Sequence, residues 1–159
     1  MIKFVQGNLL KADAEALVNT VNTVGIMGKG IALQFRQVFP ENYTTYRKAC
    51  QHNEVQPGKM CVVPTGRMLN PRYIINFPTK RHWKNMSRME DVEKGLEDLV
   101  RVVRELGILT IAIPPLACGN GGLNWSDVRP RIEAAFKDMP GVEAFIYEPV
   151  GVLEVDRRH

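Results

Sequence analysis

The sequence has few of the residues that build metal centres and disulfide frameworks. It contains only three cysteines, Cys50, Cys61 and Cys118, and none of them has CxxC spacing. An odd number of widely spaced cysteines argues against both a disulfide framework and a zinc site. The three histidines are equally scattered along the chain. We therefore expect no metal site, and a reducing compartment such as the cytoplasm.

Long apolar runs are also missing. No stretch approaches the roughly 20 apolar residues needed to span a bilayer, and the first residues do not form a secretion signal. There is no internal repeat and no low-complexity segment. The apolar fraction of 45% and the charged fraction of 24% are typical of a globular protein, and 159 residues suit one domain. We expect that domain over 1–155, followed by a frayed end at 156–159.

Short apolar runs alternate with helical patterns along the chain. Strands are expected at 2–6, 15–19, 60–64, 72–77, 109–114 and 144–148, and helices at 30–38, 41–52, 90–106 and 126–139. Alternation of this kind predicts a mostly parallel sheet with helices on both faces. The expected fold class is therefore α/β, a three-layer α/β/α sandwich around a central mixed, mostly parallel sheet.

The most informative segment is a strand that runs directly into a glycine cluster. Leu109 opens an uncharged run to residue 113 that is typical of a strand buried on both faces, and two prolines end it. The cluster at 119–122 leaves the backbone free to approach a ligand, and Asn124 or Ser126 can cap the following helix. A glycine cluster by itself is often only a tight turn.

A second strand, at 15–19, also leads into a glycine-containing loop that ends at Gly30 before a helical pattern. In open α/β sheets, ligands bind beyond the carboxyl ends of the strands. The two loops are therefore expected to converge at that edge and to grip a diphosphate from both sides.

Lys80 follows the expected strand at 72–77. If this strand is parallel to the other two, Lys80 emerges at the same edge as both glycine loops. A lysine there either pairs with phosphate as a point charge or, when desolvated, loses its proton and attacks an aldehyde carbon. The residues alone leave both roles open.

A basic segment continues from Lys80 through Arg81, His82, Trp83 and Lys84. Cations with an aromatic among them suit phosphate contacts and base stacking, although such a loop can equally be a solvated surface. The net charge of +4 favours an anionic ligand or a nucleic acid.

Four motifs together resemble the ligand loops of macrodomains, which bind ADP-ribose. They are GNLL at 7–10, the stretch from VNTVN to GKG at 18–30, NFPTK at 76–80 and PPLACGNGGLNW at 114–125. The resemblance covers nearly the whole chain. It is strongest to the branch that contains the terminal ADP-ribose protein glycohydrolase and the DarG-type antitoxins, which remove ADP-ribose from thymidine in DNA.

The resemblance implies that ADP-ribose lies across the sheet edge, as ligand and product, without a cofactor. Asn8 and Leu9 match the adenine end, Asn22 matches the asparagine that holds the distal ribose, and Lys80 matches the catalytic lysine. We expect Asn22 and Lys80 to carry the reaction. The other implied ligand residues are Asn19, Gly28, Lys29, Gly30 and Ile31 in the first loop and Pro115, Cys118, Gly119, Asn120, Gly121, Gly122 and Leu123 in the second.

One position departs from the pattern. Where the protein glycohydrolase has an aspartate that assists the lysine, this sequence has Gly121. His82 has a suitable pKa for proton transfer but is more often solvated in such a loop. Cys118 has no nearby histidine in the sequence and is not expected to be a nucleophile. The missing acid argues against ester-linked ADP-ribose on proteins.

The expected function is hydrolysis of the N-glycosidic bond between ADP-ribose and thymidine in single-stranded DNA, which reverses a DarT-type toxin. Arg81, His82, Trp83 and Lys84 are the expected DNA contacts. Two alternatives stay open: a module that binds ADP-ribose without hydrolysis, and a hydrolase of protein-linked or small-molecule ADP-ribose esters. Because the sequence ends soon after its last expected strand, direct contact with the toxin is not expected of it.

Overall fold

The computed structural model describes residues 1–150, so the expected domain end at 155 and the frayed end at 156–159 lie outside the described residues. One six-stranded sheet has the order β1-β6-β5-β2-β4-β3. The strands are β1 (Ile2–Val5), β2 (Ala16–Asn22), β3 (Cys61–Pro64), β4 (Tyr73–Lys80), β5 (Thr110–Ile113) and β6 (Glu143–Tyr147). All neighbours are parallel except β3, which runs antiparallel to β4 at the edge. The mixed, mostly parallel sheet is confirmed.

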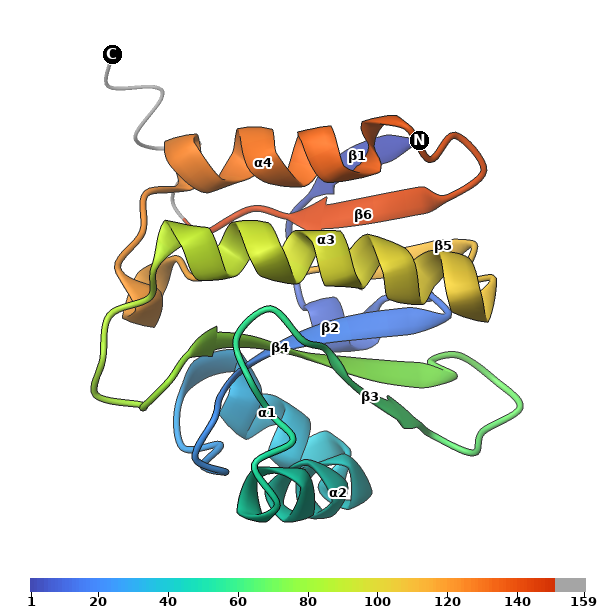
Figure 1. Cartoon of the computed structure of the whole chain (residues 1–159). Helices are drawn as coiled ribbons and strands as arrows, with labels where there is room; N and C mark the ends of the chain where they lie inside the picture. Colours follow the sequence, from blue (N-terminus) through green and yellow to red (C-terminus); the bar gives the residue numbers. More distant parts are fainter. Residues whose placement is uncertain (151–159) are drawn as a thin grey trace.

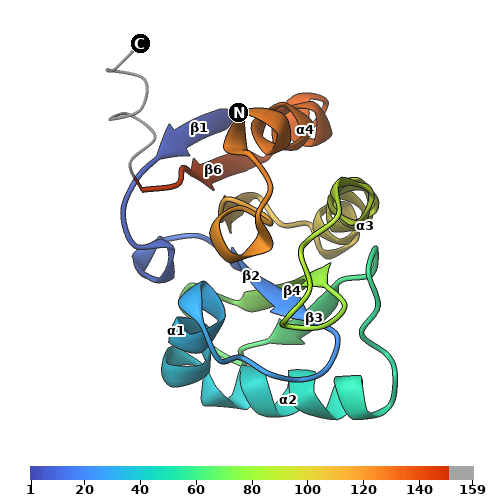
Figure 2. The same cartoon turned by 90° about the vertical axis from the view of Figure 1, so that its left-hand side faces the viewer.

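Helices cover both faces of this sheet (Figures 1 and 2). The helices are α1 (Gly30–Val38), α2 (Pro40–Gln51), α3 (Met89–Leu106) and α4 (Trp125–Lys137), with short 3-10 turns η1 (Leu9–Lys11) and η2 (Gly119–Gly121). In Figure 2, α3 and α4 lie on one side, and α1 and α2 lie on the other. The three-layer α/β/α sandwich is therefore confirmed. None of the helices within residues 1–150 has the length and apolar character required to cross a membrane.

Successive side chains of β2 enter different cores, as the two-residue period of a strand requires. Val18 packs in the cluster that contains Leu99 of α3. Leu17 packs on the opposite face with Phe35 of α1. Both faces of this central strand are buried, which explains why its sequence shows an uninterrupted apolar run rather than an alternating pattern.

β2 and β4 run further than their sequence patterns predict. They end at Asn22 and Lys80, which are register partners in the ladder, rather than near residues 19 and 77. The register shifts between Val21 and Asn22, next to Pro78. Such an irregularity accommodates a proline, which has no backbone N–H to donate. Asn22 and Lys80 are thus the paired ends of adjacent strands, not loop residues.

Leu109 is not part of the buried run predicted from the sequence. β5 begins at Thr110, and the Leu109 side chain is 60% exposed. Its backbone N–H donates to Glu15 Oε1 at 3.1 Å, and its carbonyl accepts from the Glu143 N–H at 2.8 Å. These bonds hold the turn between α3 and β5, where Ile108 is the buried residue instead.

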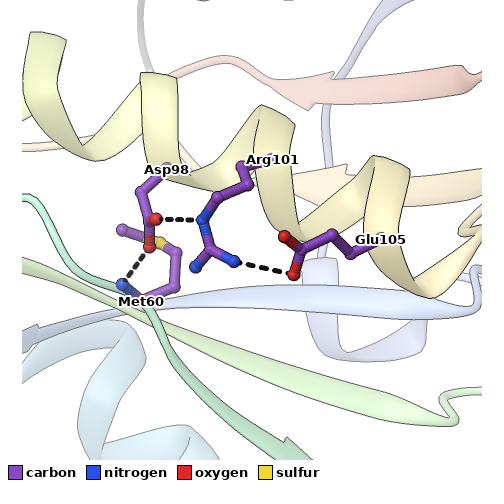
Figure 3. A network of polar contacts seen from close by, with 4 residues as sticks. All are labelled: Met60, Asp98, Arg101 and Glu105. Carbon is purple, nitrogen blue, oxygen red and sulfur yellow. Dashed lines mark hydrogen bonds and ion pairs between the residues drawn. The ribbon is translucent and has the colours of Figure 1, made fainter.

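A polar network fixes α3 to the segment that enters β3 (Figure 3). The Asp98 carboxylate accepts from the Met60 backbone N–H and from Arg101 Nε, both at 2.7 Å. Arg101 also donates to Glu105 at 2.7 Å. The Met60 amide lies outside the sheet ladder, so Asp98 supplies its acceptor and holds the preceding turn against α3.

α3 packs tightly on β4 at Gly95, which faces the Phe77 ring. This contact lets us predict how a substitution at Gly95 changes stability. A Cβ at Gly95 would lie 2.3 Å from Phe77 Cζ. Alanine gains about 1 kcal/mol of helix propensity, but forcing it against the ring outweighs that gain. We expect Gly95→Ala to lower the free energy of unfolding by about 1–3 kcal/mol in urea denaturation. Glu97→Ala, at an exposed position of α3, is the control, and a more stable Gly95→Ala protein would contradict the packing argument.

Candidate active site

The carboxyl ends of the parallel strands meet at one edge of the sheet, which faces the viewer in Figure 2. The segments after β1, β2, β4 and β5 all leave the sheet there. Because β4 is parallel to β2, the prediction that Lys80 emerges at the same edge as both glycine loops is confirmed. This edge is where ligands bind in open α/β sheets.

The two glycine loops converge at this edge as predicted. A Cβ built at Gly30, where α1 begins, would lie 3.5 Å from Nδ2 of Asn120 in η2. Gly30 itself has a φ of +57°, in the left-handed region that favours glycine. The loop after β2 and the loop after β5 are therefore in van der Waals reach of each other.

Both loops lead into the first turn of a helix that has no side-chain cap. Lys29 is the N-cap of α1 and Asn124 that of α4, and neither side chain caps its helix. Asn124 thus has the predicted position without the predicted bond, and Ser126 lies inside α4. The first amides of a helix have no intrahelical acceptor and carry the positive end of its dipole. Such amides form a binding site for an anion such as a diphosphate.

Asn22 organises the loop that follows β2. Its Oδ1 accepts from the Val24 and Gly25 amides at 3.1 Å, and its Nδ2 donates to the Ile26 carbonyl at 2.8 Å. The Tyr46 hydroxyl lies 2.7 Å from the Asn22 carbonyl and 2.9 Å from Oδ1. Burial, followed by the neighbouring Cys50, raises the pKa of Tyr46, so its hydroxyl stays protonated as a donor. Sequence reasoning missed Tyr46.

Asn19 lies beneath the site rather than at its surface. Its side chain is fully buried, and its Nδ2 donates to Asn76 Oδ1 at 3.2 Å. Asn76 also exchanges hydrogen bonds of 2.9 and 3.1 Å with Asn42 of α2. We therefore expect Asn19 to hold β2, β4 and α2 together rather than to touch a ligand.

The predicted adenine end contains one exposed and one buried residue. Asn8 is exposed, and its Oδ1 accepts from the Leu10 amide at 3.0 Å. Leu9 is buried in the cluster against which Ile31 and Tyr147 also pack. Tyr147, the last residue of β6, therefore lies at this end of the edge. Sequence reasoning missed Tyr147, because an aromatic residue at the end of a strand is common.

Lys80 is partly buried and forms no ion pair within residues 1–150. Burial, followed by the positive charge of Lys29, lowers the pKa of the Lys80 ammonium. Its cavity has a volume of about 420 Å³ and is lined by Lys80, Arg81, Lys84, Asn85, Met86, Arg88 and Asp91. In the described part of the chain, no group of acids, cysteines and histidines is placed to hold a metal ion.

The basic segment folds into a compact turn. Arg81 Nη2 lies 3.3 Å from Asp91 Oδ1, so its side chain is tethered to α3. His82 Nδ1 accepts from the Lys84 amide at 3.1 Å. The Trp83 ring lies 5.2 Å from the His82 ring and 4.9 Å from Lys84 Nζ, and Trp83 is 42% exposed. An exposed indole beside the Lys84 ammonium suits base stacking, whereas Arg81 is less free than its sequence position indicates.

The end of this segment packs directly on the second glycine loop. The Ser87 N–H donates to the Gly121 carbonyl at 3.0 Å. A Cβ at Gly121 would lie 2.7 Å from Ser87 Oγ, and one at Gly122 would lie 1.8 Å from Met86 Cε. At the position that holds an acid in the protein glycohydrolase, a side chain would therefore have to displace Ser87. Burial raises the pKa of the Cys118 thiol to about 11, which keeps it protonated and argues against a nucleophilic role.

The Ser87–Gly121 contact makes a testable prediction. We expect Gly121→Ala to lower the free energy of unfolding by about 1–3 kcal/mol, because its Cβ would overlap Ser87. Gly141→Ala is the matched control, since an added Cβ there meets no atom within 4 Å. Adding Ser87→Gly to Gly121→Ala recovers much of the loss, with a coupling above about 0.5 kcal/mol in a double-mutant cycle. Additive losses would show that Ser87 is not the obstacle.

Comparison with known proteins agrees with this geometry. The family model of the Macro domain matches residues 18–132. The macrodomain of Mycobacterium tuberculosis DarG is 56% identical, with a TM-score of 0.93 over 94% of this chain and 98% of that one. The Thermosipho africanus DarTG structure in complex with ADP-ribose is 34% identical, with a TM-score of 0.85 over 94% of this chain and 42% of that one.

A curated relative has a name that states its activity. The "DNA ADP-ribosyl glycohydrolase" of Thermus aquaticus is 57% identical over 150 residues, which are 94% of this chain and 42% of that protein. The chain thus spans less than half the length of the curated DNA ADP-ribosyl glycohydrolases that it matches. Fold, loop motifs and identity agree over most of the described residues. The chain therefore belongs to the macrodomain family, in the branch of the DarG macrodomains.

Proposed function

We propose that this macrodomain is an ADP-ribosyl glycohydrolase that removes ADP-ribose from thymidine bases in single-stranded DNA and so reverses a DarT-type toxin. The observation that carries the proposal is Lys80, whose pKa is lowered and which ends β4 opposite Asn22. The activity in the name of the Thermus aquaticus relative supports it. So does the ADP-ribose in the Thermosipho africanus DarTG structure.

ADP-ribose would lie along the carboxyl edge of the sheet. Its adenine would lie near Asn8 and Leu9, and its diphosphate would lie between the segments Gly28–Ile31 and Gly119–Leu123. Within the second segment the Gly122 and Leu123 amides already donate to loop carbonyls, so the donors would come from the amides before them. The distal ribose would then lie beside Asn22, with its anomeric carbon toward Lys80. Because the Asn22 Oδ1 accepts from three loop amides, we expect Asn22 to fix the shape of the loop around this ribose.

The proposed reaction uses Lys80 as a nucleophile. Its neutral amine attacks the anomeric carbon of the distal ribose while the bond to thymine N3 breaks. The proton of the attacking amine passes to the departing N3, and the ribosylated lysine opens to a Schiff base. Water then adds to the C=N bond, which releases ADP-ribose and restores the amine. No cofactor takes part in these steps.

The surroundings of Lys80 favour a nucleic-acid substrate. Lys84 and Arg88 line the same cavity, where they can neutralise DNA phosphates. The Trp83 ring lies beside Lys84 and can stack on a base. Thymine N3 is hidden in a duplex, so a single-stranded or extruded base is required. The proposal involves a DarT-type toxin only as the source of the ADP-ribosylated DNA and assigns no contact with it. A cytoplasmic location stays a prediction.

Replacing Lys80 tests the chemistry. We expect Lys80→Ala to lower the release of ADP-ribose from modified single-stranded DNA at least about 100-fold, as the loss of a catalytic group does. Borohydride should trap a ribosylated adduct of the wild-type protein, seen by mass spectrometry, and none of Lys80→Ala. Lys137→Ala, at the exposed end of α4, is the control.

Other outcomes of this experiment identify the alternatives. A wild-type protein that binds ADP-ribose but releases none is a binding module. Release from ADP-ribosylated protein, but not from DNA, identifies an ester hydrolase. Turnover of DNA without a trapped adduct supports acid catalysis by the Lys80 ammonium.

The pH dependence separates the two roles of Lys80. A nucleophilic amine must be neutral, so kcat should rise with pH through a pKa below the ordinary lysine value of about 10.4. The positive charge of Lys29 helps to lower the pKa of Lys80, so Lys29→Gln should move the midpoint of the profile to higher pH. Lys48→Gln, on the exposed side of α2, should leave the midpoint in place. A rate that falls as pH rises would contradict the nucleophilic role.

A further inference from the structure

Two cavities flank Arg81, and the proposed reaction uses only one of them. The first contains Lys80. The second has a volume of about 380 Å³ and is lined by Thr23, Gln56, Pro57, Arg81, Asp91 and Lys94. Arg81 and Asp91 line both cavities, so these two residues form the wall between them.

Arg81 is held in this wall through both its backbone and its side chain. The Thr23 hydroxyl donates to the Arg81 carbonyl at 2.6 Å. The Arg81 guanidinium is anchored by Asp91, which is 2% exposed. About half of the Arg81 side chain remains exposed, so its other N–H groups are available to an acceptor in solution.

Lys94 brings an uncompensated positive charge to the second cavity. It follows Asp91 by three residues, which places both on one face of α3. Asp98, further along this face, is committed to Met60 and Arg101 (Figure 3). Lys94 forms no ion pair with any residue that the structure describes.

The opposite side of the cavity is fixed by the same network. The bond from Met60 to Asp98 holds the preceding turn against α3, where a Cβ at Gly58 would lie 3.2 Å from Lys94 Cβ. Gln56 lies in this turn, and its Nε2 donates to the Asn53 carbonyl at 3.0 Å. The cavity therefore combines two cations and a side-chain amide with one carboxylate that Arg81 already neutralises.

We propose that this second cavity binds the backbone phosphate of a nucleotide next to the modified thymidine. The DNA strand would cross Arg81, with the modified base in the cavity of Lys80 and the neighbouring phosphate between Arg81 and Lys94. Cations on both sides of the wall match a polyanion that continues past the reacting nucleotide. This inference rests on the proposed function, because it assigns the path of the same substrate.

The test compares two substrates that differ in flanking phosphates. Lys94→Glu should raise KM for an ADP-ribosylated single-stranded oligonucleotide about tenfold or more, as the loss of a charge-assisted hydrogen bond does, with kcat unchanged. The same variant should hydrolyse the ADP-ribosylated thymidine nucleoside, which has no flanking phosphate, as the wild type does. Lys94→Gln should reduce the slope of log KM against log salt by about 0.7.

Lys48→Glu is the matched control, because it makes the same change of charge on α2. An equal effect of Lys94→Glu and Lys48→Glu would overturn the subsite, as would equal losses on oligonucleotide and nucleoside. If the wild type hydrolyses neither substrate, the proposed function fails by itself. The binding of a fluorescent, unmodified oligonucleotide by the same variants then decides the subsite: weaker binding by Lys94→Glu alone supports it, and unchanged binding overturns it.

Discussion

The candidate site depends on the parallel pairing of β2 with β4 and on the register of this pairing. Asn19 and Asn76 are register partners in this ladder and are joined by a buried hydrogen bond of 3.2 Å. A slip of one residue would break this bond and leave buried amide groups without partners, at a cost of about 1–3 kcal/mol each. The register then shifts by one residue between Val21 and Asn22, and this shift places Asn22 opposite Lys80 at the end of the strands. A buried polar contact therefore supports the pairing of the two side chains to which the proposed reaction is assigned.

The glycines of the second loop have two roles. Their flexible backbone suits an approach to diphosphate, and φ values of +67° at Gly119 and +80° at Gly122 require it. Gly121 and Gly122 are also the surface on which Ser87 and Met86 pack. Ser87, which follows the basic segment, thus occupies the space that a side chain at position 121 would enter. This contact couples the predicted DNA-binding segment to the predicted diphosphate loop.

Charge is distributed unevenly around the reacting lysine. Asp91 is the only carboxylate that lines either described cavity beside Arg81, and it is paired with that arginine. Lys29, which lines neither cavity, is the cation that lowers the pKa of Lys80, and the cations that line the two cavities are placed to attract a polyanion. Nearby positive charge lowers the pKa of a lysine and so favours the neutral amine that the proposed reaction uses. The same positive charge attracts an anionic substrate.

The fold class, the approximate positions of the helices and the edge of the candidate site could all be predicted from the amino-acid sequence. Short apolar runs and glycine loops carry this information locally, so the prediction of a helix at 30–38 agrees with α1 residue for residue. The sequence did not reveal that Tyr46 holds Asn22 or that Asp91 anchors Arg81. Nor did it explain why position 121 is glycine. These contacts became visible in the tertiary structure alone. Each joins two residues that are 10 to 34 positions apart in the sequence and that packing brings close together.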